Sequence, residues 1–126
     1  MGKFVVRKVK TGIMFNLKAG NGEVIATSEV YSSEASCMKG IASVVKNAPI
    51  AALENQTVEG FAKEKCPKFE VYVDKAGEYR FRLYAINGLC VCHSSHGYST
   101  KGGCKGGIDS IKRFAKEASV DKSYLK

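Results

Sequence analysis

Apolar and polar residues alternate along several short segments of this chain, and the segments form two matching sets. An alternation with a period of two predicts β-strands, because successive side chains of a strand point to opposite faces. In the second segment, for instance, Ile13, Phe15 and Leu17 alternate with Met14 and Asn16. The predicted strands cover residues 4–7, 13–19 and 23–28 in the first set, and residues 69–73, 79–85 and 89–94 in the second.

A helix is predicted after each set of strands. In the first helix the expected buried stripe consists of apolar residues three or four positions apart, namely Ala35, Met38, Ile41, Ala42 and Val45. Ser32 and Ser99 stand where an N-cap acceptor is wanted, and Pro49 prevents the first helix from continuing. Beyond the helices, residues 50–56 and 118–124 are predicted to form short closing strands.

Turn signals link the predicted strands into hairpins. Asn21-Gly22 and Asn87-Gly88 separate the second and third strands of each set. Asn-Gly is typical of a type I′ turn, in which both central residues have a positive φ. We therefore expect a tight type I′ hairpin in each set.

The two sets are copies of one motif. Phe4 and Phe69 are 65 positions apart, and Tyr31 and Tyr98 are 67 positions apart. Cys37-x-x-Gly40-Ile41 likewise returns as Cys104-x-x-Gly107-Ile108, where the glycines predict close packing of helix on sheet. Such copies are typical of a unit that buries its apolar face against its twin. We expect a first repeat (1–56), a linker (57–66) and a second repeat (67–126) in one compact unit.

These residues resemble a known family of small prokaryotic proteins. The turn Lys18-Ala19-Gly20-Asn21-Gly22-Glu23, the helix entry at Tyr31 and the helix motif Gly40-Ile41-Ala42-Ser43-Val44 occur in the order typical of the YegP-like family. The resemblance implies an α+β fold in which two tandem β3-α-β repeats form one antiparallel sheet. Two helices would pack on one face, and the repeats would exchange their C-terminal strands as in a dimer. It implies no activity, cofactor or catalytic residue.

Composition and charge narrow the possible environments and partners. A chain that is 44% hydrophobic and 25% charged is typical of a globular domain, and no apolar run approaches the ~18 residues of a membrane span. The net charge of +8 attracts polyanions, so nucleic acid is one possible partner, but charge alone leaves the partner unknown. Residues 1–10 offer no apolar export segment, so the five cysteines are expected to be reduced thiols in the cytoplasm. The internal pairing of repeats predicts a monomer.

Alternation leaves one face of the predicted sheet without helices. Its candidate ligand surface consists of cations and aromatic rings: Arg7, Lys18, Tyr72, Arg80, Arg82 and Tyr84. Sheets of this kind bind single-stranded nucleic acids by stacking bases on aromatic rings. Two alternatives remain open: such residues also suit a solvated face, and a second copy or another protein could cover them.

A cluster of potential metal ligands, Cys90-x-Cys92-His93-x-x-His96, precedes the second helix. Its spacing matches no standard zinc site, and the first repeat has Val24 and Ala26 at the positions of the two cysteines. We interpret Cys90 and Cys92 as buried packing residues and expect no metal or other cofactor.

Two further motifs point away from enzymatic chemistry. The glycine-rich stretch 101–107 aligns with the interior of the first helix, so it is no phosphate-binding loop. The two histidines have no carboxylate close in sequence, and no paired carboxylates occur at a plausible site. The sequence therefore predicts a non-enzymatic binding module of unknown function. Single-stranded nucleic-acid binding and protein–protein assembly are the alternatives.

Overall fold

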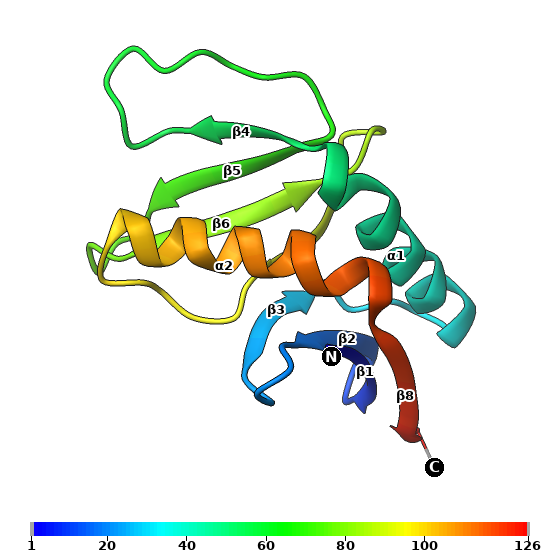
Figure 1. The fold of residues 1–126 in the computed structure, drawn as a ribbon. Helices are drawn as coiled ribbons and strands as arrows, with labels where there is room; N and C mark the ends of the chain where they lie inside the picture. The colour runs from blue at the N-terminus through cyan, green and yellow to red at the C-terminus, as the bar shows by residue number, and fades with distance from the viewer. Residues whose placement is uncertain (1, 126) are drawn as a thin grey trace.

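One eight-stranded sheet carries the whole fold in a computed structural model, which describes residues 2–125 (Figure 1). The first repeat contains β1 (Lys3–Val9), β2 (Gly12–Lys18), β3 (Val24–Ser28), α1 (Glu34–Asn47) and β4 (Ala52–Asn55). The second contains β5 (Lys68–Val73), β6 (Tyr79–Tyr84), β7 (Cys90–Ser94), α2 (Lys101–Phe114) and β8 (Ser119–Tyr124). A short 3-10 turn follows each helix, at Ala48–Ile50 and Ala115–Glu117.

The strand order β4-β5-β6-β7-β3-β2-β1-β8 shows that the two repeats exchange their last strands. β4 of the first repeat pairs with β5 of the second, and β8 of the second pairs with β1 of the first. The predicted exchange is confirmed. The expectation of a wholly antiparallel sheet is wrong at both edges, because these two pairings are parallel. β4 and β5 are joined by the long segment 56–67, which can return the chain to the start of β5, and β1 and β8 are separated by almost the whole chain, so neither parallel pair needs a tight turn.

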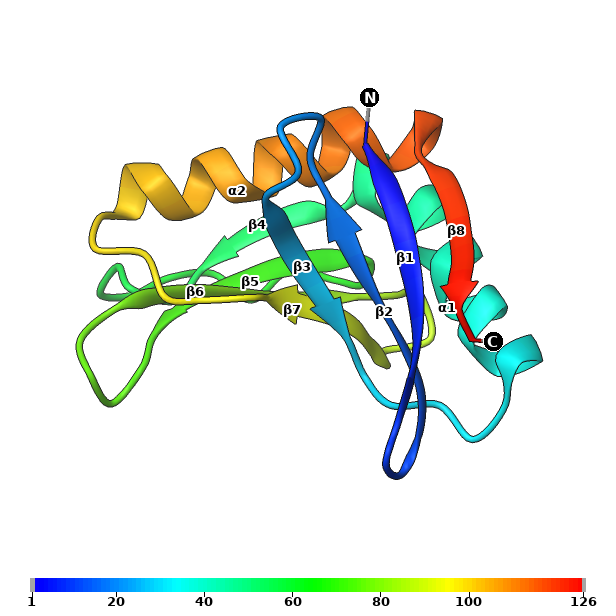
Figure 2. The ribbon, with the colours of Figure 1, turned by 90° about the horizontal axis from the view of Figure 1, so that it is seen from below.

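Both helices pack on one face of the sheet, and each spans the two repeats (Figures 1 and 2). α1 contacts β2 and β7, whereas α2 contacts β6 and β3. Four fully buried phenylalanines form the centre of the core, with edge-to-face ring contacts within each repeat: Phe4 with Phe15, and Phe69 with Phe81. We call the other face of the sheet the open face.

The helix boundaries differ slightly from the predicted ones. The N-caps are Ser33 and Thr100, one residue after the predicted Ser32 and Ser99; their hydroxyl oxygens accept from the backbone N–H of Ser36 and Gly103. The buried side of α1 is also rotated from the predicted stripe. Ala35 and Ala42 are exposed and Met38 and Val45 are half-buried, whereas the buried residues are Cys37, Gly40, Ile41, Val44 and Asn47. Gly40 lies on the buried side, where the Tyr31 hydroxyl occupies the space that a Cβ would need.

The Asn-Gly turns form hairpins, but not of type I′. Positive φ values occur at Gly22 (85°) and Gly88 (83°), and no residue other than glycine has one within 2–125. Gly22 N–H donates to Ala19 C=O and Ala19 N–H donates to Glu23 C=O, so the loop has three residues and ends in a left-handed glycine. Asn21 instead accepts the backbone N–H of Glu23.

No helix within residues 2–125 is long and apolar enough to cross a bilayer.

Candidate functional site

A continuous row of paired residues crosses the open face through all eight strands. Arg82 of β6 stands at its centre, paired with Glu70 on one side and with His93 on the other. Residues directly opposite each other on neighbouring strands project to the same face of the sheet. From β4 to β8, the residues paired in this way are Glu54, Glu70, Arg82, His93, Thr27, Asn16, Val5 and Asp121. Most charges gather at one end of this row, on β4 of the first repeat and on β5, β6 and β7 of the second, whereas Asp121 lies at the other end, on β8.

A hollow of about 540 Å³ lies on this half of the open face. We call it the open-face hollow; its walls come from β5, β6, β7 and the segments that follow β3 and β5. The lining residues are Glu29, Tyr72, Asp74, Arg80, Arg82, Tyr84, Cys90 and His93. Four of the six residues predicted as a ligand surface are therefore brought together here: Tyr72, Arg80, Arg82 and Tyr84.

The other two predicted residues lie elsewhere on the open face. Arg7 is on β1, paired with Met14, and Lys18 is on β2, paired with Lys3. Two strands, β7 and β3, separate β6 from β2. At about 4.8 Å per strand, Lys18 is roughly 14 Å from the nearest strand that carries the arginines.

The guanidinium of Arg82 lies over an aromatic ring inside the open-face hollow. Its Cζ atom is 4.1 Å from the ring centroid of Tyr72, a cation–π distance. A carboxylate oxygen of Glu70 is 3.8 Å from Nη1, at the long end of the range for an ion pair. The Arg82 side chain is 40% exposed, so part of it remains accessible to solvent.

Arg80 is held at the edge of the hollow by the β5–β6 turn. Its Nε is 2.6 Å from Asp74 Oδ2. The other oxygen, Asp74 Oδ1, accepts the backbone N–H of Ala76 and of Glu78. Hydrogen bonding from Arg80 and then from this turn lowers the pKa of Asp74. The turn thus supplies a fixed anion that positions Arg80.

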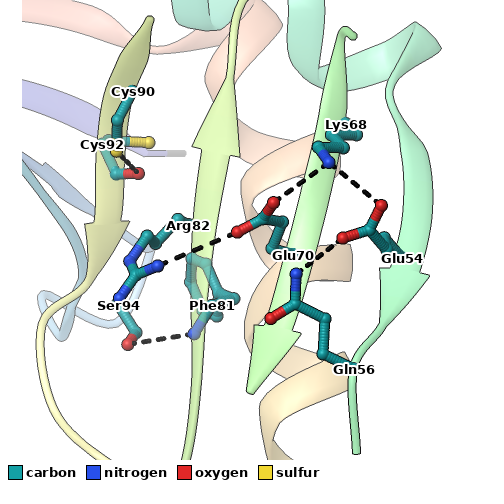
Figure 3. A network of polar contacts seen from close by, with 9 residues as sticks. All are labelled: Glu54, Gln56, Lys68, Glu70, Phe81, Arg82, Cys90, Cys92 and Ser94. Atoms are coloured by element: carbon teal, nitrogen blue, oxygen red, sulfur yellow. Dashed lines mark hydrogen bonds and ion pairs between the residues drawn. The ribbon is translucent and has the colours of Figure 1, made fainter. Parts of the chain in front are cut away.

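A chain of alternating charges joins this hollow to the edge of the sheet (Figure 3). Lys68 Nζ is 3.0 Å from Glu54 Oε1 and 3.0 Å from Glu70 Oε2, and Glu70 in turn reaches Arg82. Glu54 is only 2% exposed and also accepts from the Gln56 side chain at 2.6 Å and the Glu64 backbone at 2.7 Å. These hydrogen bonds, led by that of Gln56, lower the pKa of Glu54 to about 2. The buried carboxylate of Glu54 thereby positions Lys68, which in turn pairs with Glu70 beside Arg82.

A bulge in β7 places the two cysteines of the predicted cluster on opposite faces. Cys92 pairs with Leu83 and Cys90 with Tyr84, so Val91 is an extra residue. Cys92 is fully buried toward the helices, as predicted. The prediction is wrong for Cys90, which is half-buried and lines the open-face hollow. The adjacent apolar residues Val91 and Cys92 interrupt the alternation, and this was the available sequence signal.

Cys90 contributes an uncharged side chain to the open-face hollow. Burial, followed by the nearby Glu29, raises the pKa of Cys90 to about 11, so the group is a thiol at neutral pH. His93 Nε2 is 3.9 Å from Glu29 Oε2, whereas the ring of His96 contacts that of Tyr98 at a tilt of 47°, with 4.5 Å between ring centroids. Within residues 2–125 no group of three His, Cys, Asp or Glu side chains is arranged to hold a metal ion.

The predicted motif residues outside the hollow have structural contacts. The ring of Tyr31 stacks on Phe15, and that of Tyr98 stacks on Phe81, with 6.4 Å between centroids in each pair. The tyrosine hydroxyls lie over Gly40 and Gly107, where an added Cβ would overlap them. Because glycine has no Cβ at these two positions, the tyrosine side chains can pack directly against the helix backbones.

Two comparisons relate this chain to proteins without an assigned activity. The sequence pattern described as "Domain of unknown function (DUF1508)" matches residues 10–54 and 74–121. A UPF0339 protein of Pseudomonas aeruginosa is 35% identical over 119 residues, which cover 94% of each chain. A UPF0339 protein of Treponema denticola is 58% identical over 53 residues, 41% of this chain but 91% of that relative. One repeat thus makes up almost all of the Treponema protein.

Solved structures share the arrangement of both repeats. The solution structure of YegP from E. coli, a protein of unknown function, has a TM-score of 0.78 and 33% sequence identity, covering 97% of this chain and 92% of that one. A UPF0339 protein of Shewanella oneidensis has a TM-score of 0.79 and 30% identity, covering 99% of this chain and 93% of that one.

Proposed function

This chain belongs to the DUF1508 family, which includes YegP and the UPF0339 proteins and has no assigned activity, and from its own geometry we propose that it is a non-enzymatic binding module for single-stranded nucleic acid. The resemblance seen in the sequence is thereby confirmed. The observation that carries the proposal is the open-face hollow, in which Tyr72 and Tyr84 lie beside Arg80 and Arg82.

Stacking supports this class of ligand. Every nucleobase presents a flat face, and each base stacked on an aromatic ring contributes about 1–3 kcal/mol. The Arg82 guanidinium, lying on Tyr72 with 40% of its side chain exposed, extends that platform by a second planar group. An arginine fork can also bind phosphate or base oxygens in two places at once.

Charge within the hollow sets the character of the binding. The cations Arg80 and Arg82 are accompanied by the carboxylates of Glu29 and Asp74. The site itself is therefore nearly balanced, and the net charge of +8 acts mainly as a long-range attraction spread over the surface. We expect the affinity to depend on salt through only a few phosphate contacts, and on stacking for the remainder.

We place this activity in the cytoplasm. All five cysteines have free thiols, which suits a reducing compartment.

The proposal is tested by anisotropy titrations of labelled single-stranded DNA and RNA oligomers, with heparin as competitor. Tyr72→Ala and Arg82→Ala should each lower the affinity about tenfold or more, and Tyr72→Phe should retain it because the ring remains. Lys105→Ala is the matched control, since it removes one exposed cation on α2, on the other side of the sheet.

Equal losses in Arg82→Ala and Lys105→Ala would mean that charge alone attracts the oligomer, and the proposal would fall. Absence of binding at low salt by the wild-type protein would also overturn it.

A second candidate function is protein–protein assembly, favoured by the tip of the β6–β7 hairpin. Ile86 and Leu89 are 69% and 65% exposed, whereas the first repeat has Gly20 and Glu23 at the matching positions. Self-association of this kind would be insensitive to salt and would be lost in Ile86→Gly, as measured by sedimentation velocity.

A further inference from the structure

A second hollow, of about 230 Å³, lies between the first half of α1 and the β6–β7 hairpin. We call it the α1 hollow. Tyr31, Leu89 and Val91 give it apolar walls, and Ser36, Lys39 and Asn87 add a few polar groups. Apolar walls with a small number of polar groups are typical of sites for flat organic ligands such as a nucleobase.

The α1 hollow adjoins the open-face hollow. Glu29 and Cys90 line both of them. Leu89 and Val91, the neighbours of Cys90 in the chain, line the α1 hollow, while Cys90 itself projects beside Tyr84 because of the bulge in β7. The two hollows thus meet at Cys90, at the start of β7, and at Glu29, which follows β3.

The residues that form the two hollows differ from those at the matching positions of the other repeat. In the open-face hollow, Tyr72, Arg80, Arg82 and Tyr84 correspond to Arg7, Met14, Asn16 and Lys18. In the α1 hollow, Ser36, Lys39, Leu89 and Cys90 correspond to Gly103, Gly106, Glu23 and Val24. The fold accommodates either set, since both halves form the same elements. The residues that distinguish the two hollows therefore lie side by side in the fold, although the fold does not require them at these positions.

We propose that a single strand bound in the open-face hollow continues past Cys90 and Glu29 into the α1 hollow, which takes the next nucleotide. This inference rests on the proposed function and adds a second subsite to it. The base lies against Leu89 and Val91, and the exposed ammonium of Lys39 pairs with the adjoining phosphate. Stacking on Tyr72 and Arg82 holds the preceding part of the strand.

The test compares a short thymidine oligomer of about two nucleotides with one of about eight, a length within the range of known single-strand sites. Leu89→Glu introduces the residue that the first repeat carries at this position, so the turn is known to accept it. Lys39→Ala removes the cation. The matched controls are Ile86→Gly, in the same turn but outside the hollow, and Lys46→Ala, two turns further along α1.

Leu89→Glu and Lys39→Ala should each weaken binding of the longer oligomer about tenfold, with little change for the short one and little change in either control. If both variants bind the longer oligomer as well as the wild type while Tyr72→Ala still lowers its affinity about tenfold or more, the second subsite is wrong and the proposed function stands. Equal losses for both oligomer lengths would likewise overturn the second subsite. If the wild type binds neither oligomer, the proposed function fails first.

Discussion

At the scale of single residues, neighbouring glycines of α2 have opposite roles. Gly107 lies under Tyr98, whose hydroxyl occupies the position where a Cβ would stand. Gly106, the preceding residue, has nothing within 4 Å of an added Cβ. Glycine is required at position 107 for steric reasons, whereas Gly106 only adds flexibility to the unfolded chain and weakens the helix.

We predict opposite effects when each of these glycines is replaced by alanine. Gly106→Ala should stabilise the protein by about 0.5–1 kcal/mol, because alanine is the better helix former. Gly107→Ala should destabilise it by about 1–3 kcal/mol, because Tyr98 must leave its place on Phe81. The free energy of unfolding in denaturant measures both. A stabilised Gly107→Ala variant would show that Tyr98 packs in another way.

At the scale of elements, one buried carboxylate attaches the connection between the repeats to the sheet. Glu54 on β4 accepts from Gln56 and from the backbone of Glu64, and it pairs with Lys68 of β5. Its pKa is lowered from 4.5 to about 2, first by Gln56 and then by the other donors against the opposing effect of burial. A lowered folded-state pKa stabilises the protein above the unfolded value and loses that contribution as pH falls.

We therefore predict a loss of stability between about pH 4.5 and pH 2 that depends on Glu54. Glu54→Gln should cost about 1–3 kcal/mol at neutral pH, because charged hydrogen bonds are lost. The difference from the wild type should shrink through that pH range. Glu59→Gln, on the same connection but exposed, is the control. Unfolding free energies at several pH values decide the matter, and parallel curves for wild type and Glu54→Gln would contradict the assignment.

The bulge in β7 is an element-scale feature that decides the composition of the site. Strict alternation puts Cys90 and Cys92 on one face, whereas the extra residue Val91 turns Cys90 toward Tyr84. The first repeat has the same shift, with Ile25 as the extra residue between Val24 and Ala26. At both bulges two consecutive apolar residues lie on the core side, whereas a period-two pattern predicts that consecutive residues point to opposite faces.

At the scale of the whole molecule, the two repeats share one core. Each helix contacts strands of both repeats, and each terminal strand pairs with the other repeat. The separation of one repeat would therefore expose the core and break three strand pairings, β4 with β5, β8 with β1 and β3 with β7.

This shared core predicts a single cooperative unfolding transition. The backbone N–H of Phe15 donates to Ser28 Oγ, and that of Phe81 donates to Ser94 Oγ, so the two amides occupy matching buried positions in different repeats. Native-state hydrogen exchange should give both the same opening free energy, roughly 5–15 kcal/mol. A difference above about 1 kcal/mol, beyond the spread expected of fully buried amides, would indicate independent repeats.

The sequence by itself determined the elements, their order and the repeat, because local periodicity and turn residues act over a few positions and occur twice. The exchange of the last strands followed only from the family resemblance. It also placed Tyr72, Arg80, Arg82 and Tyr84 on one face. Only the tertiary structure decided the parallel edges, the separation of Arg7 and Lys18 from the hollow, the ion pairs of the arginines and the position of Cys90. These depend on strand order and register, which arise from packing between residues far apart in the chain.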